Sequence, residues 1–259
     1  MKIKLLIAVI ICAIYLNLSV ATAQTDFYIP SLMYHNINDD YNQKNASVEI
    51  SSEKFKEHML TLKNEGYTAI FFDEYLLYLN GKAELPEKPI LITFDDGYLN
   101  NYTVGFPILK ETGMKATIFI ITGRMGLQGA VTYPHFTWDQ AMEMEKSGVV
   151  DIQSHTQYHG YLSNMSTASV VLELRKSKFV IEKNLNKKVD FLAYPYGACN
   201  DAVIDIAKKA GYKAAVLAEP KNAGVNRKGE NPFLTKRITV YGNMSGADLL
   251  EEIKENEGW

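Results

Sequence analysis

The chain has 259 residues, of which 47% are hydrophobic, 22% charged and 11% aromatic. It is long and apolar enough to form a sizeable core, and this composition excludes a disordered or collagen-like chain. The formal net charge of -3 is too small to favour nucleic acid or an anionic membrane surface as a partner. Length alone allows one or two domains, because a single (β/α) barrel occupies about 200–250 residues.

The first residues have the features of a secretory signal peptide. Two lysines give a basic start, an apolar run follows to about residue 15, and the small residues Ala-Thr-Ala end at Ala23. An uncleaved membrane anchor is the alternative, because the apolar run is only slightly shorter than a membrane span. We expect a signal peptide over residues 1–23 and a mature domain over residues 24–259. The mature protein is then secreted or periplasmic, in the cell envelope, with no stable membrane span.

Short apolar runs alternate with segments of helical spacing along the rest of the chain. Buried strands are predicted at Ser31–Tyr34, Thr68–Phe72, Ile90–Phe94, Ala116–Ile121, Val149–Ile152, Phe191–Tyr194, Ala214–Leu217 and Ile238–Tyr241. Helices are predicted at Ser52–Glu65, Asp73–Leu79, Gly105–Thr112, Trp138–Lys146, Thr167–Asn184, Asp201–Ala210 and Ser245–Lys254. Strand and helix alternate about seven times, which indicates parallel strands with crossover helices. We expect an α/β fold, a distorted (β/α) barrel of about seven strands in a single domain.

Enzymes with this architecture carry their reactive side chains at the carboxyl ends of the strands. Asp95 and Asp96 follow the apolar strand that ends at Phe94, and Gly97 follows them. Two adjacent carboxylates at a buried strand end repel each other, so a bound cation there relieves the repulsion. A plain Asp-Asp-Gly turn is the alternative, because these residues are common in turns.

A second strand end carries two histidines. His155 and His159 are four residues apart, which on a helical turn places their Cβ atoms about 6 Å apart on one face and suits a shared metal ion. Thr156 stands where a zinc protease of the HExxH class has its general base, and this excludes that class. Two imidazoles and one carboxylate leave a fourth position for water, which is the pattern of a catalytic zinc site.

Three motifs together resemble one known family. The segments Thr93–Gly97, Ser154–His159 and Ala193–Gly197, in this order, resemble the polysaccharide deacetylases of carbohydrate esterase family 4, the NodB-homology domain. The resemblance extends from Pro30 to about Tyr241. It implies a distorted (β/α) barrel and the metal-dependent removal of acetyl groups from N-acetylated or O-acetylated sugars. For an N-acetylated polymer this is a hydrolase that acts on carbon–nitrogen bonds other than peptide bonds.

The resemblance also assigns roles to individual residues. By position, Asp96, His155 and His159 correspond to metal ligands, and Asp95 corresponds to the general base. The backbone N–H of Tyr196 corresponds to the donor that stabilises the developing oxyanion. The implied cofactor is a divalent metal, with Zn2+ as the first candidate and Co2+, Ni2+ or Mn2+ as alternatives. Metal-activated water then attacks the acetyl carbonyl.

Two positions depart from the family pattern. Ala193 stands where an arginine usually orients the base, and no histidine follows His159 to supply the usual general acid. His35, directly after the first strand, and the Ala-Tyr-Pro-Tyr-Gly variant resemble the subgroup that deacetylates poly-N-acetylglucosamine. In that subgroup the strand order is circularly permuted and the acid comes from the N-terminal strand, so His35 is the expected acid. Arg237, at the start of the last strand, is the expected partner of Asp95. The alternatives are that His35 has only a structural role and that Arg237 is an ordinary surface residue.

We therefore predict a secreted, metal-dependent deacetylase whose partner is an acetylated polysaccharide, in the first place an N-acetylglucosamine polymer. Acetyl-xylan and peptidoglycan are alternative substrates. The alternative outside the enzymes is a carbohydrate-binding barrel that has lost catalytic activity. Ala193, in place of the usual arginine, favours this alternative. The sequence leaves the oligomeric state open.

Overall fold

The computed structural model describes residues 28–40, 45–129, 132–218, 226–227 and 229–257. The predicted signal peptide, residues 1–23, lies outside the described residues. In the part of the chain that is described, no helix is both long and apolar enough to cross a membrane.

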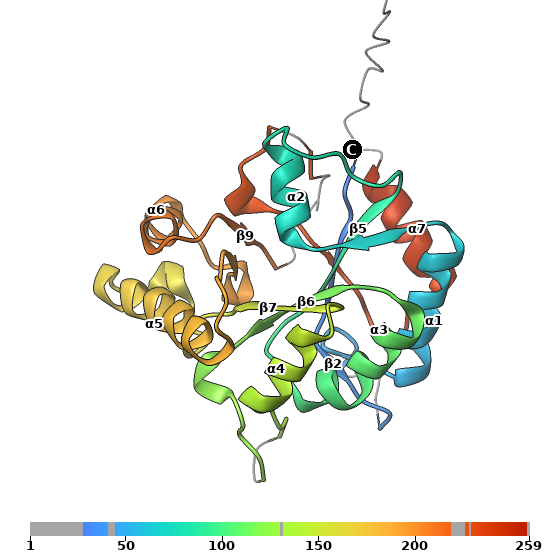
Figure 1. Ribbon diagram of the computed structural model, residues 1–259, viewed down its shortest axis with the longest axis horizontal. Coiled ribbons are helices and arrows are strands. Elements are labelled where there is room, and N and C mark those ends of the chain that lie inside the picture. The colour runs from blue at the N-terminus through green and yellow to red at the C-terminus, as the bar shows by residue number, and fades with distance from the viewer. Residues whose placement is uncertain (1–27, 41–44, 130–131, 219–225, 228, 258–259) are drawn as a thin grey trace, which may run out of the picture.

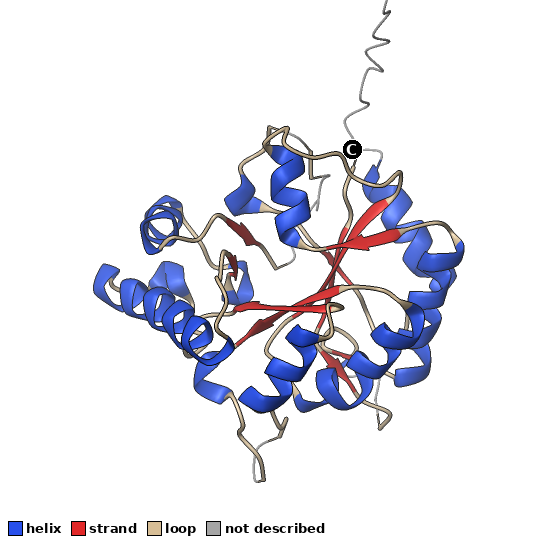
Figure 2. Ribbon diagram, in the orientation of Figure 1, coloured by secondary structure: helices blue, strands red, loops and turns tan. Residues whose placement is uncertain are grey.

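Parallel strands form one curled sheet at the centre of the molecule, with the helices around it (Figure 2). Its strands are β1 (Ser31–Tyr34), β4 (Thr68–Ile70), β5 (Pro89–Phe94), β6 (Ala116–Ile120), β7 (Val150–Ser154), β8 (Phe191–Ala193), β9 (Ala214–Val216) and β10 (Ile238–Thr239). The order is β10-β1-β5-β6-β7-β8-β9, and β4 pairs with the first half of β5. A separate small sheet pairs β2 (Asn36–Ile37) with β3 (Glu49–Ile50). The predicted distorted (β/α) barrel is confirmed.

The first and last strands of the sequence are neighbours in this sheet. β1 pairs with β10 on one side and with β5 on the other, in parallel. Leu32 lies opposite Ile238, and Tyr34 lies opposite Phe94. The residues just after β1 and β5 therefore meet at one edge, and a residue just before β10 lies two strands from β5.

Crossover helices surround the sheet (Figure 1). They are α1 (Ser52–Asn64), α2 (Phe72–Leu79), α3 (Phe106–Thr112), α4 (Trp138–Lys146), α5 (Thr167–Leu185), α6 (Asp201–Ala210) and α7 (Gly246–Glu257). Several begin at a side chain that accepts a backbone hydrogen bond, such as Thr137 before α4 and Asn200 before α6. α3 and α6 end at glycines in the left-handed conformation, Gly113 and Gly211.

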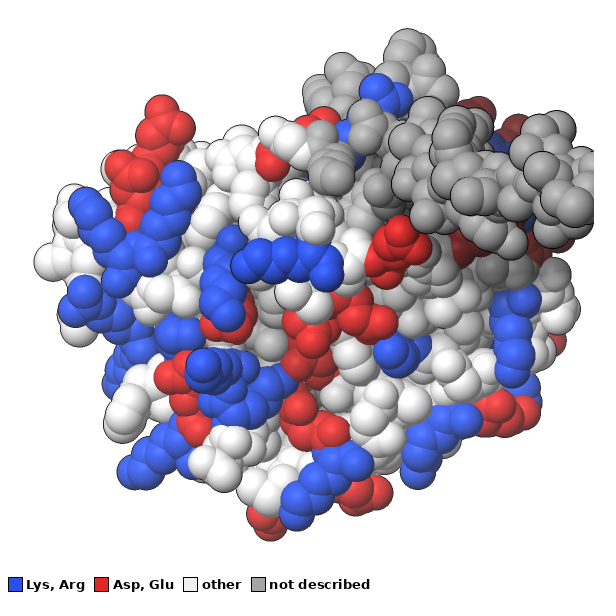
Figure 3. Space-filling model, turned by 45° about the horizontal axis from the view of Figure 1, so that its top comes forward, with Lys and Arg blue, Asp and Glu red and all other residues white. Residues whose placement is uncertain are grey.

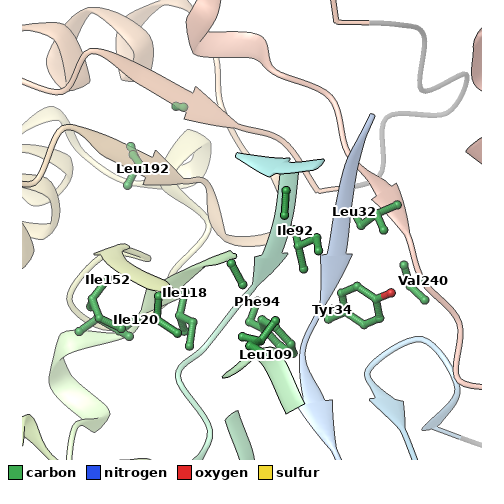
Figure 4. Close-up of a cluster of buried hydrophobic side chains, with 14 of the residues drawn as sticks. Leu32, Tyr34, Ile92, Phe94, Leu109, Ile118, Ile120, Ile152, Leu192 and Val240 are labelled. Carbon is green, nitrogen blue, oxygen red and sulfur yellow. The ribbon is translucent and has the colours of Figure 1, made fainter. Parts of the chain in front are cut away.

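Alternate side chains of the strands point to two different cores. Ile92 and Phe94 of β5 lie with Ile120 of β6 in the larger cluster of buried side chains (Figure 4). Leu91 of β5 and Phe119 of β6 belong to a second cluster, which also takes residues from β8, β9 and α2. Strands from opposite sides of a curled sheet meet only in its interior, so the second cluster fills the barrel. Because apolar side chains fill the interior, the ends of the strands are where polar side chains can form a site.

Charged side chains of both signs are interspersed on the face displayed in Figure 3. One ion pair at the surface joins Lys56 and Glu111 at 2.7 Å, with side chains that are 43% and 58% exposed. An exposed pair of this kind contributes about 0–1 kcal/mol. Such a pair therefore adds little to stability beside the two buried cores.

Candidate active site

The chain turns sharply after β5, and this turn separates the two predicted carboxylates. Asp96 has φ = 74° and Gly97 has φ = 83°, both in the left-handed region. Such a conformation costs a non-glycine residue about 1–3 kcal/mol and is concentrated at functional sites. The turn directs Asp95 toward Arg237 and Asp96 toward the two histidines.

The two histidines lie in a loop, so the predicted helical turn is wrong. Thr156 and His159 have positive φ values of 68° and 62°, which a right-handed helix does not allow. The ring Nδ1 of His155 lies 2.9 Å from the carbonyl oxygen of Ala193 on β8. Donation from Nδ1–H to that carbonyl leaves the lone pair of Nε2 free to bind a metal. The Nε2 atoms of His155 and His159 are 3.1 Å apart, so the loop brings the imidazoles together by a different backbone path.

Asp96 completes a set of three possible metal ligands. Its Oδ1 lies 3.6 Å from Nε2 of His155 and 3.4 Å from Nε2 of His159. This oxygen is buried and has no hydrogen-bond partner among the described residues, although the carboxylate also accepts a hydrogen bond from Tyr98. Ligands at about 2.0–2.1 Å from a tetrahedral ion are about 3.3 Å apart. The three distances lie around this value, so the residues fit a divalent metal ion.

Burial and neighbouring groups favour the metal-binding forms of these side chains. Burial raises the pKa of Asp96, but the histidines around it outweigh burial and leave the pKa lowered. Burial, followed by the His155 imidazole, lowers the pKa of His159 to about 4. A neutral imidazole and an ionised carboxylate are the forms that coordinate metal ions.

Asp95 and Arg237 form a buried ion pair. Two guanidinium nitrogens donate to the two carboxylate oxygens, each at 2.7 Å, and Arg237 is only 1% exposed. The guanidinium also donates to Thr93 Oγ1 at 3.0 Å and to the carbonyl oxygen of Leu217 at 2.7 Å. Burial raises the pKa of Asp95, but Arg237 and then His155 lower it by more, so the net pKa is well below its usual value. Asp95 is therefore held ionised in a fixed orientation.

His35 follows β1 at the same edge of the sheet. The N–H of Asp95 donates to the carbonyl oxygen of Tyr34, which fixes the two strand ends side by side. The ring Nδ1 of His35 is buried and has no hydrogen-bond partner among the described residues. Burial lowers the pKa of His35, while the negative charges of Asp95 and Asp96 act in the opposite direction. The charges of both carboxylates therefore act on the imidazole.

Tyr196 borders the three possible metal ligands from the turn after β8. It lies in a short helical turn, Pro195–Gly197, with φ = 58°, and is 53% exposed. Its ring contacts that of His159, with centroids 4.7 Å apart, and stacks on Tyr161 at 4.0 Å. The structure therefore brings all seven predicted site residues to one rim.

Sequence reasoning did not predict the contacts that several other residues make at this rim. Thr93 of β5 precedes Asp95 by two positions. Because side chains alternate along a strand, this spacing places Thr93 on the same side of the sheet as Asp95. Tyr161 follows His159 by two positions, and Tyr98 follows Asp96 by two. Nothing in the sequence signals their contacts with the site.

Gly197 allows the turn at Tyr196 to pack closely against the next strand connection. Its φ is +64°, and a Cβ atom there would lie 2.7 Å from the carbonyl oxygen of Ala218. We expect Gly197→Ala to lower the free energy of unfolding by about 1–3 kcal/mol. Urea unfolding measures this loss. Gly113→Ala is the control, because Gly113 also has positive φ but has nothing within 4 Å of such a Cβ. Equal losses in the two variants would contradict the predicted clash.

Known proteins resemble this chain in both fold and sequence. A family model described as polysaccharide deacetylase matches residues 82–215. The poly-beta-1,6-N-acetyl-D-glucosamine N-deacetylase of Staphylococcus aureus is 31% identical over 205 residues, which cover 76% of this chain and 69% of that protein. The structure of the Streptococcus pyogenes deacetylase PplD in complex with acetate is 31% identical, with a TM-score of 0.79, and the match covers 88% of this chain and 99% of PplD. A Bacillus cereus polysaccharide deacetylase structure is 29% identical, with a TM-score of 0.76, over 88% of this chain and 69% of its own.

These similarities place this chain in the class of (β/α)-barrel hydrolases. The chain belongs to the polysaccharide deacetylase family, carbohydrate esterase family 4 with its NodB-homology domain.

Proposed function

We propose that this protein is a secreted, divalent-metal-dependent deacetylase that removes N-acetyl groups from an N-acetylglucosamine polymer. The observation that carries the proposal is the convergence of Asp96, His155 and His159 beside the Asp95–Arg237 ion pair. The name of the Staphylococcus aureus relative supports the polymer, and acetate, the expected product, is bound in the Streptococcus pyogenes structure. The features of residues 1–23 support secretion, with residues 24–259 as the mature domain.

Each side chain at the rim has a role in this proposal. Asp96, His155 and His159 would hold a divalent metal ion, for which Zn2+ is the first candidate. When bound, a divalent ion polarises the acetyl carbonyl and lowers the pKa of a water molecule. Asp95 accepts a proton from the attacking water. Each carboxylate oxygen has two lone pairs, so the bonds to Arg237 leave Asp95 able to accept a further proton.

Two groups act on the other atoms of the amide. The backbone N–H of Tyr196 donates to the oxygen that becomes negatively charged, which is worth about 3 kcal/mol for one such donor. His35 donates a proton to the departing amine of the sugar, because an unprotonated amine is a poor leaving group.

The role of His35 predicts a loss that depends on the leaving group. We expect His35→Ala to lower kcat on N-acetylglucosamine oligomers by about 10²–10⁴-fold. Hydrolysis of an aryl acetate should change little, because its phenolate leaves without protonation. Metal content measured on the same preparation should equal that of the wild type. Equal losses on both substrates, or no loss on the oligomers, would contradict the role of His35 as acid.

Acetate release from defined polymers tests the proposed function. The purified protein is loaded with Zn2+, Co2+, Ni2+ or Mn2+ and incubated with N-acetylglucosamine oligomers, acetyl-xylan and peptidoglycan. We expect the highest kcat/KM on the N-acetylglucosamine oligomers and a loss of activity when a chelator removes the metal. Binding to a polymer with no release of acetate from any substrate would instead favour the non-catalytic barrel. Ala193 favours that alternative, but Arg237, which lies just before β10, directs its guanidinium at Asp95.

A further inference from the structure

A buried carboxylate lies behind the histidine loop and takes no part in the proposed chemistry. Glu173, in the first half of α5, is 8% exposed. Its Oε2 accepts hydrogen bonds from the backbone N–H groups of Gln157 at 2.9 Å and Tyr158 at 2.8 Å. Both donors lie between His155 and His159. The carboxylate therefore contacts the stretch of backbone that joins the two imidazoles.

The backbone of this loop is strained, and such a contact can stabilise it. Thr156 and His159 both have positive φ, and a β-branched residue such as threonine rarely adopts this conformation. The N–H groups of Gln157, Tyr158 and His159 are three consecutive donors. That of His159 donates to Thr156 Oγ1 at 3.0 Å, and the other two donate to Glu173. Consecutive N–H groups beside a left-handed residue form a concave site for an anion, and here the carboxylate fills it.

The same face of α5 also contacts the start of the loop. Ser177 lies one helical turn after Glu173, and its Oγ accepts a hydrogen bond from Ser154 Oγ at 2.8 Å. Ser154 Oγ in turn accepts from the N–H of Thr156 at 3.2 Å. α5 thus holds the loop at its first residues through Ser177 and at its centre through Glu173.

We infer that Glu173 is a positioning residue, which holds the loop of residues 155–159 so that both histidines direct Nε2 at the same point as Asp96. The inference rests on the proposed role of His155 and His159 as metal ligands. Hydrogen-bond partners behind the ligands of a metal site set the ligands' orientation, and losing one typically costs 10–100-fold in metal affinity. Metal affinity therefore reports on this role.

Three substitutions separate hydrogen bonding from charge. Glu173→Ala removes the acceptor. Glu173→Gln removes the charge but keeps a carbonyl oxygen, and a single oxygen accepts both bonds in the structure. Glu182→Ala is the matched control, because Glu182 lies on the same helix and accepts the N–H of Val189, far along the chain from the loop. Zn2+ or Co2+ titration of the metal-free full-length chain gives the dissociation constants.

We expect Glu173→Ala to weaken metal binding by about 10–100-fold, Glu173→Gln to weaken it much less, and Glu182→Ala to match the wild type. Metal affinity of Glu173→Ala within twofold of the wild type would overturn the inference. If Glu173→Ala does not fold, Glu173→Asp replaces it. Its carboxylate keeps the charge but is one methylene too short, so affinity should fall below that of Glu173→Gln, and the reverse order would overturn the inference.

Hydrogen exchange separates this inference from the proposed function. In the metal-free protein, we expect the amides of Gln157 and Tyr158 to exchange faster in Glu173→Ala than in the wild type, with little change in Glu182→Ala. A wild-type protein that binds no divalent ion would refute the proposed metal site. The two amides would still test Glu173 in that case, and unchanged exchange would show that the loop holds its shape without it.

Discussion

Replacement of Arg237 by methionine is expected to lower the free energy of unfolding by about 3–5 kcal/mol, because it leaves Asp95 as an uncompensated buried charge. Both oxygens of Asp95 receive hydrogen bonds of 2.7 Å from a guanidinium that is 1% exposed. Methionine has a similar length but no donor, so it fills the space and leaves the carboxylate unpaired. Urea unfolding of the metal-free protein measures the loss.

The same substitution should lower kcat and leave metal content nearly unchanged, since the side-chain hydrogen bonds of Arg237 reach Asp95 and not the three proposed ligands among the described residues. Lys236→Met is the matched control. Lys236 is the adjacent cation in the sequence, and it pairs only loosely with Glu230 at 3.7 Å. We expect this control to change stability by less than about 1 kcal/mol. Equal losses of unfolding free energy in the two variants would show that the buried Asp95–Arg237 pair contributes no more to stability than the looser pair of Lys236.

The fold was predictable because its elements carry strong local signals. α4 and α6 have the predicted bounds, and each begins at a side-chain cap. β4 ends at Ile70, before the predicted end at Phe72, because an apolar run shared by a strand and the next helix shows no boundary. The π-helical turn Asn101–Gly105 before α3 was not predicted, because its backbone hydrogen bonds have no residue pattern of their own.

The site was predictable where it depends on strand ends and not where it depends on loop shape. Asp96 and His155 lie together because the carboxyl ends of parallel strands share one rim. The helical turn predicted for the histidines was wrong, because a spacing of four residues does not reveal a left-handed residue at Thr156. Glu173 was missed for a related reason. Its hydrogen bonds go to backbone amides, which any sequence possesses, so only the packing of α5 reveals them.

The neighbouring aspartates provide the sharpest test of the site, because the same isosteric substitution should affect them differently. Asp96→Asn replaces a charged ligand by a weaker amide oxygen, and asparagine tolerates the positive φ at this position. We expect metal affinity to fall by about 100-fold or more, since losing a partner behind the ligands already costs 10–100-fold. Asp95→Asn should leave metal affinity within a few fold of the wild type and lower kcat by about 10²–10⁴-fold, the usual contribution of a general base.

Metal titration and acetate release, measured on both variants, distinguish a ligand from a base. A metal-binding defect of similar size in the two variants would show that Asp95 is also a ligand, and the division of roles would be wrong. Asp95→Asn also weakens the pair with Arg237, so a thermal unfolding midpoint accompanies each rate. If Asp95→Asn stays folded, binds metal and loses activity on the oligomers, the loss belongs to proton transfer, because the carbonyl oxygen of asparagine still accepts from the guanidinium but cannot take a proton from water.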